Sequence, residues 1–200
     1  VPDWLYIWEH DFDTIRDLAF EHARRVINRY GQYIQAWDVI SGIHANNCFT
    51  FNFEQLMELT RMTSALAKQL SPRATAIVDL VAPWGEYYAR NQRTIPPLLY
   101  ADMAVQSGVT FDAFGLQFHF GPGVDGMYVR DMFQISSLID LFTKLGKPLH
   151  ITAVEVPSDT FTPRDSGGSG AALNLDGGTW REPWNEAVQA EWLRQFVEIA

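Results

Sequence analysis

Segments of strand length alternate with segments of helical periodicity along the chain, and this order constrains the fold more than any other feature. Apolar residues recur every three or four positions in the helical segments, and compact apolar runs separate those segments. Helices are expected over 11–30, 52–70, 97–106, 129–145 and 184–199, and strands over 33–40, 74–81, 111–118 and 149–156. Strict alternation of this kind predicts a parallel sheet with right-handed crossovers.

Local signals define several boundaries of these elements. Gly31 ends the first helical segment, and Asn52 with Gln55 has the spacing of a capping box at the start of the second. Residues 157–183 are rich in Gly, Ser, Thr and Asp and have little periodicity, so a long loop is expected there. A loop of that length in a compact domain more often carries function than separates domains.

Four strands are too few to close a βα barrel, which needs eight. The chain of 200 residues also begins and ends with a helical segment, and its length suits a single domain. The sequence therefore predicts either an interior piece of a larger α/β barrel or a small open sheet.

Charge and hydropathy disfavour several classes of partner. Fifteen basic and twenty-four acidic residues give a net charge of −9, so nucleic acids and anionic membranes are not expected as partners. No apolar run approaches the ~18 residues of a membrane-spanning helix, and the opening residues lack the pattern of a signal peptide. Seven tryptophans suit the stacking of sugar rings, although the core of a large α/β protein also uses aromatic residues.

The carboxyl ends of the predicted strands are where a parallel α/β fold binds its ligand. Gln117 and His119 lie two apart on one strand and so share a face, although a hydrogen-bonded histidine at a strand end is an equal alternative. Trp84 follows the second strand and offers either a stacking face or a core anchor. For Asp38, in the middle of the first strand, a structural role as a partnered buried carboxylate is favoured.

No pattern in the sequence indicates a metal or another cofactor. The five histidines have no metal-ligand spacing with nearby acids, and no glycine-rich phosphate loop joins a strand to a helix. No GxSxG nucleophile elbow occurs. The single cysteine, Cys48, cannot form an internal disulfide.

Several motifs, taken in order, resemble the xylanase-type glycoside hydrolase family 10. They are PDW at 2–4, NRYG at 28–31, AWDVI at 36–40, SPRA at 71–74, FGLQFH at 114–119, PLHIT at 148–152 and EAVQAEW at 186–192. The resemblance implies an eight-stranded TIM-type (β/α)8 barrel, of which this chain carries strands four to seven and is incomplete at both ends. The remaining strands are then expected in flanking sequence or in another chain. The resemblance also suggests an extracellular or periplasmic location.

The same resemblance implies a substrate and exposes a departure from the family. Its members cleave β-1,4 linkages of xylan with retention, using an acid/base carboxyl group and a nucleophilic carboxylate ~5–5.5 Å apart. The acid/base position aligns with Gly42, and the nucleophile position aligns with Ala153. Neither residue can perform the chemistry of a glutamate.

Two functional hypotheses follow. In the favoured one, a non-catalytic barrel either has a structural role or binds a β-linked polysaccharide. Gln117, His119 and Trp84 would then contact the sugar. In the other, an active hydrolase uses a relocated pair, Glu155 and His44, each two residues beyond a lost position and so on the same face. The second is disfavoured because a two-residue step moves a side chain ~6–7 Å along a strand.

The long loop from 157 to 183 follows the strand of the expected nucleophile and should overhang the barrel mouth. Trp180 in this loop either stacks on a sugar or packs on the barrel, whereas Trp184 is expected to anchor the final helix. Gly168 and Gly170 allow this loop many backbone conformations.

Overall fold

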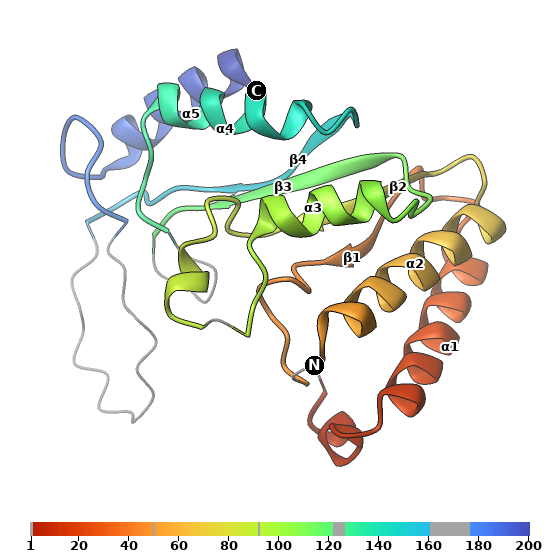
Figure 1. Ribbon diagram of the computed structural model, residues 1–200. Helices are drawn as coiled ribbons and strands as arrows, with labels where there is room; N and C mark the ends of the chain where they lie inside the picture. Colours follow the sequence, from red (N-terminus) through yellow and green to blue (C-terminus); the bar gives the residue numbers. More distant parts are fainter. Residues whose placement is uncertain (1, 50, 92, 122–126, 161–176) are drawn as a thin grey trace.

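A computed structural model describes residues 2–49, 51–91, 93–121, 127–160 and 177–200 (Figure 1). The strands are β1 (Ala36–Ser41), β2 (Thr75–Leu80), β3 (Ala113–His119) and β4 (Leu149–Glu155). The α-helices are α1 (Phe12–Tyr30), α2 (Phe53–Leu70), α3 (Pro97–Gln106), α4 (Met132–Thr143) and α5 (Glu186–Ile199), and the 3-10 helices are η1 (Asp3–Trp8) and η2 (Glu86–Ala89).

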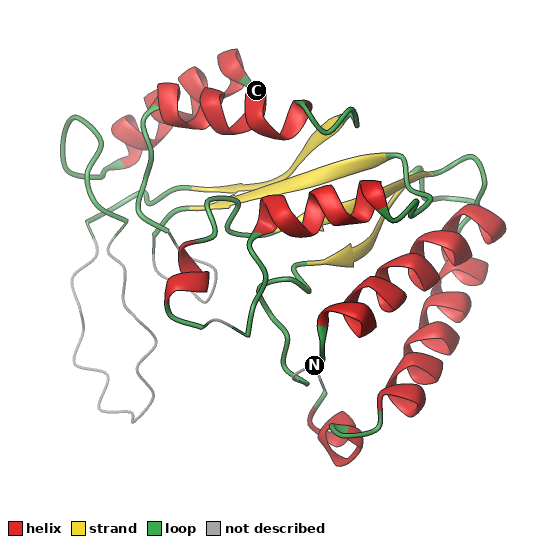
Figure 2. Cartoon of the chain, in the orientation of Figure 1, coloured by secondary structure: helices red, strands yellow, loops and turns green. Residues whose placement is uncertain are grey.

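The four strands form one sheet in the order β1-β2-β3-β4, and every neighbouring pair is parallel. The predicted parallel α/β topology is therefore confirmed. In Figures 1 and 2, α1 and α2 lie at the β1 end of the sheet, α3 lies in front of the middle strands, and α4 with α5 lies at the β4 end. Among the described residues, β1 and β4 each pair with one neighbour and leave an outer edge without a strand.

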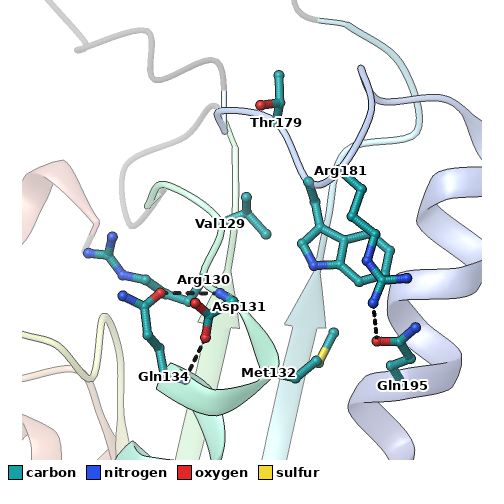
Figure 3. A pocket seen from close by; sticks show the side chains of 9 residues that line it. Val129, Arg130, Asp131, Met132, Gln134, Thr179, Arg181 and Gln195 are labelled. Carbon is teal, nitrogen blue, oxygen red and sulfur yellow. Dashed lines mark hydrogen bonds between the residues drawn. The ribbon is translucent and has the colours of Figure 1, made fainter.

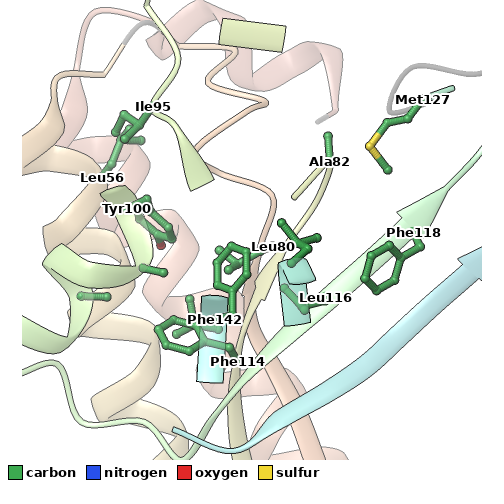
Figure 4. Packing of buried hydrophobic residues seen from close by; sticks show 14 of the residues in the cluster. Leu56, Leu80, Ala82, Ile95, Tyr100, Phe114, Leu116, Phe118, Met127 and Phe142 are labelled. Atoms are coloured by element: carbon green, nitrogen blue, oxygen red, sulfur yellow. The ribbon is translucent and has the colours of Figure 1, made fainter. Parts of the chain in front are cut away.

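The core lies between this sheet and the helices. Alternate residues of β2 and β3 belong to the core cluster, namely Ala76, Val78, Leu80, Phe114, Leu116 and Phe118. Figure 4 shows several of them packed with Tyr100 of α3 and Phe142 of α4. Because side chains alternate along a strand, the intervening residues point to the opposite face of the sheet. That face carries Asp79, Gln117 and His119.

Two β-bulges change which residues face that side. The register of the β1–β2 pair shifts between Asp38 and Ile40. The register of the β3–β4 pair shifts between Leu116 and Gln117. Val39 and Thr152 are the extra residues in these two places. The bulges bring Ser41 opposite Asp79, and Ala153 and Glu155 opposite Gln117 and His119.

Aromatic packing attaches the last helix to the sheet. The ring of Trp192 lies 5.1 Å from that of Phe196 and 5.4 Å from that of Phe120. Phe196 in turn contacts Phe118 of β3, with ring centroids 5.4 Å apart. Trp184, just before the helix, is 2% exposed and belongs to the same core, as its anchoring role predicts.

Element boundaries follow the capping chemistry. Asn52 and Gln55 form the expected capping box of α2, and Gly31 follows α1 at its C-cap. The expected strand at 33–40 begins only at Ala36, because the backbone N–H of Tyr33 donates to the carbonyl of Tyr30 and prolongs the turn after α1. The helix expected from residue 129 begins at Met132, because Asp131 caps it.

Candidate functional site

Polar side chains from all four strands form one hydrogen-bonded network at the carboxyl end of the sheet. Its centre is Asp79 of β2, which is 1% exposed. The carboxylate accepts from Ser41 Oγ at 2.7 Å, from Thr152 Oγ1 at 2.5 Å, and from the amide Nε2 of Gln117. A buried carboxylate is costly unless donors surround it, and three strands supply these donors.

This carboxylate fixes the orientation of the Gln117 amide. Nε2 of Gln117 must face Asp79, because two oxygens in that place would repel each other. The amide oxygen of Gln117 therefore faces His119 Nε2, 2.9 Å away, and it can only accept. His119 consequently carries a proton on Nε2.

The far side of the same imidazole contacts Glu155. His119 Nδ1 lies 3.1 Å from Glu155 Oε2. His119 therefore links the Gln117 amide to the Glu155 side chain. With 66% of its side chain exposed, Glu155 is the solvent-facing end of the network.

A glycine makes room for the centre of the network. A Cβ atom on Gly115 would lie 2.2 Å from Asp79 Oδ1 and 2.8 Å from Thr152 Cγ2. Both distances are below any allowed contact, so Gly115 in the sequence GLQ is required for the close approach of β2, β3 and β4.

His44 does not join this network. It is fully buried, with its ring 5.4 Å from that of Tyr100 and 5.8 Å from that of Tyr87, on the helix side of the sheet. Its Nε2 has no hydrogen-bond partner among the described residues. Burial lowers the pKa of His44 to about 3, so the imidazole stays neutral in the folded protein. The structure thus separates His44 from Glu155 and does not form the pair that the sequence suggested.

Gly42 and Ala153, the residues that the resemblance places at the positions of the catalytic glutamates, lie close to the network. Gly42 is buried at φ +60°, and a Cβ atom there would lie 3.0 Å from Val81 Cγ1. Ala153 pairs in register with Gln117, on the face of the network.

Trp84 and Trp180 pack against other side chains and are not fully exposed to solvent. Trp84 is half-buried between Phe118, at 5.7 Å, and the guanidinium of Arg130, at 5.4 Å. Trp180 is 8% exposed and belongs to the core cluster, which favours the packing role over stacking on a sugar. Residues 161–176 of the long loop, with Gly168 and Gly170, lie outside the described residues.

Asp38 differs from the expectation of a buried carboxylate. It is exposed, because β1 is an edge strand and no further strand of the described chain covers it. Desolvation and, next, the charge of Asp79 raise its pKa. Asp38 therefore lies on the same polar face as the network.

Ser41 and Thr152 are members of the network that the sequence did not single out. Both reach Asp79 only because a bulge turns them to this face. Asp79 itself could have been identified from the sequence, because it is an acidic residue inside the apolar run AIVDLVA. In the described ranges, no group of three His, Cys, Asp or Glu residues could hold a metal ion. Nor is any helix there long and apolar enough to cross a bilayer.

The sequence resembles curated xylanases at low identity. An endo-1,4-beta-xylanase/feruloyl esterase of Xylanibacter ruminicola is 24% identical over 187 residues, which are 83% of this chain and 24% of the relative. Endo-1,4-beta-xylanase B of Neocallimastix patriciarum is 22% identical over 166 residues, which are 78% of this chain and 18% of the relative. No family model matches the sequence.

Solved xylanase structures share the fold. Xylanase 10B from Thermotoga maritima aligns with a TM-score of 0.61 at 18% identity, over 100% of this chain and 54% of that chain. A GH10 structure from Paenibacillus barcinonensis aligns with a TM-score of 0.56 at 16% identity, over 76% and 47%. The chain therefore has the fold of part of a GH10 TIM barrel, as expected. It spans about half the length of these structures and a quarter or less of the curated relatives.

Gly115→Ala tests the close approach that holds the network together. The added methyl group must displace Asp79, so we expect the free energy of unfolding to fall by about 1–3 kcal/mol. The imidazole ¹⁵N resonances of His119 should move as well, because Gln117 loses its fixed partner. Gly108→Ala is the control: its Cβ meets no atom within 4 Å, and although φ +69° costs stability, the His119 resonances should stay in place. Unmoved His119 resonances in Gly115→Ala would contradict the network.

His44→Phe tests the buried imidazole through the pH dependence of stability. The unfolded chain binds a proton at His44 below pH ~6.5, whereas the folded chain does so only near pH 3, so stability is lost as pH falls through this window. Phenylalanine keeps the ring contacts and cannot titrate. The stability lost between pH 6.5 and 4 should therefore shrink by up to about 3 kcal/mol in urea unfolding. Ser64→Ala, at a buried position of α2 without a titratable group, should leave that loss unchanged.

Proposed function

We propose that this chain binds a β-1,4-linked polysaccharide of the xylan type at the carboxyl end of its sheet and does not hydrolyse it. The observation that carries the proposal is the continuous network from Asp79 through Gln117 and His119 to the exposed Glu155. The shared fold with xylanases and the GLQ-x-H strand support the choice of ligand. In this proposal the strands that complete the barrel lie in flanking sequence or in another chain, and they share the cleft.

The network is suited to recognising sugar hydroxyl groups. Asp79 fixes Gln117, and Gln117 fixes His119, so the groups near the surface are held in place before a ligand arrives. Glu155 presents carboxylate oxygens to solvent, and these accept hydrogen bonds from hydroxyl donors. Groups that are already ordered lose little conformational entropy on binding.

We expect no hydrolysis because of the residues that the resemblance places at the two catalytic positions. A retaining glycosidase needs a proton donor and a nucleophile on opposite sides of the scissile bond. Gly42 and Ala153 provide neither, and His44 is buried and neutral. Binding survives such losses because binding and proton transfer depend on different groups.

Calorimetric titration of the full chain with a xylo-oligosaccharide measures the proposed binding. We expect heat of binding without release of reducing sugar. His119→Ala should weaken binding about tenfold, which is the size of one lost charge-assisted hydrogen bond. His22→Ala, on the exposed surface of α1, is the matched control and should bind as the unaltered chain does. Equal affinity in the two variants would place the ligand elsewhere.

An active hydrolase that uses Glu155 is the second candidate. The contact of His119 Nδ1 with Glu155 Oε2 at 3.1 Å favours it, because an imidazole beside an exposed carboxyl group is an arrangement that can transfer a proton in acid catalysis. In that case reducing sugar is released from xylan, and Glu155→Gln abolishes the release while binding remains. Release that persists in Glu155→Gln would remove Glu155 from the mechanism.

A further inference from the structure

A pocket of about 470 Å³ lies between the start of α4 and the segment that leads into α5 (Figure 3). Val129, Met132 and Trp180 give it apolar walls; in Figure 3, Thr179 lies at the top of the view and the Arg181 side chain runs down from the loop to Gln195. Its walls include α4, α5 and the segments before them, so it belongs to the helical layer and not to the polar face of the sheet. The network of Asp79 contributes none of its lining residues.

Arg181 is held in this pocket by a tight turn. The backbone N–H of Glu182 donates to the carbonyl of Trp180 at 2.7 Å, and Arg181 between them has φ +60°. This left-handed conformation is uncommon for a residue with a side chain. Its result is that the guanidinium lies over the Trp180 indole, 4.5 Å from the ring centroid.

The stacked guanidinium still has free donors. Its face is covered by Trp180, and one nitrogen, Nη2, donates to Gln195 Oε1 at 3.3 Å. Among the described residues, no carboxylate oxygen lies within 4.0 Å of the Arg181 nitrogens, whereas Arg130 pairs with Glu86 and Arg194 pairs with Glu191. A guanidinium stacked by its face presents its N–H groups edge-on, in the geometry that binds a carboxylate through two hydrogen bonds.

Two acidic residues lie near Arg181 without forming an ion pair with it. Glu191 of α5 accepts hydrogen bonds from Arg194 and Gln195, and Arg181 acts on its charge only from beyond 4.0 Å. Asp131 accepts the backbone N–H of Gln134 at 2.8 Å and so caps α4. The positive end of that helix offsets the charge of Asp131. A carboxylate brought by a ligand can therefore approach the guanidinium.

The geometry points to this pocket as a binding site for a sugar that carries a carboxylate, a uronic acid. The carboxylate pairs with Arg181, the apolar side of the sugar ring lies against Val129 and Met132, and Thr179 offers a hydroxyl group to the ring oxygens. A volume of about 470 Å³ accommodates a monosaccharide. This assignment does not rest on the proposed function, because the two sites share no residue.

The experiment titrates the full chain with glucuronate and, separately, with glucose and acetate, and follows binding by calorimetry and by the indole signal of Trp180. Glucuronate should bind, while glucose and acetate should bind at least about tenfold more weakly. Arg181→Asn removes the guanidinium and keeps a residue that tolerates positive φ, so the variant should fold and lose glucuronate binding by at least about tenfold. Arg25→Gln, on the exposed face of α1, makes the same change of net charge and should bind normally.

Three results would overturn the assignment. Acetate that binds as well as glucuronate would show a carboxylate site without sugar recognition. Glucose that binds as well as glucuronate would show that Arg181 does not distinguish a charged sugar from a neutral one. Unchanged glucuronate binding in Arg181→Asn would place the site elsewhere. Xylo-oligosaccharide binding by the unaltered chain and by His119→Ala tests the proposed function independently of these three results.

Discussion

The buried carboxylate of Asp79 determines how the four strands come together at their carboxyl ends. A carboxylate that is 1% exposed must be surrounded by donors, and its donors come from the three other strands. This arrangement requires local departures from regular structure. Ser41 and Thr152 need a bulge each, and Asp79 and Thr152 need the missing side chain of Gly115 beside them. The irregularities of the sheet therefore have one common cause.

The same interaction extends to the surface. Because Asp79 orients Gln117, and Gln117 orients His119, the contact between His119 and Glu155 at the solvent edge depends on a carboxylate three side chains away. A chain of hydrogen bonds of this kind polarises each member in turn. A substitution at one member of the network therefore removes a hydrogen bond from its neighbour.

The fold could be predicted from the sequence because its signals are local. Periodicity and the Asn52–Gln55 box identified α2, and alternating strands and helices identified the parallel sheet. The site was harder to predict, because side chains alternate regularly between the two faces only where a strand has no bulge. Glu155 faces the network because Thr152 is inserted before it, whereas β1 has already ended at Ser41 when the chain reaches His44. The step from Gly42 to His44 therefore crosses a turn, and His44 points to the helices.

The turn at Gly42 also bears on how this sequence could evolve. A glutamate installed there by mutation would need both a left-handed backbone, at φ +60°, and a displacement of Val81. Selection for hydrolysis would thus have to reshape the end of β1 before a new carboxyl group could act, and several changes would have to arrive together.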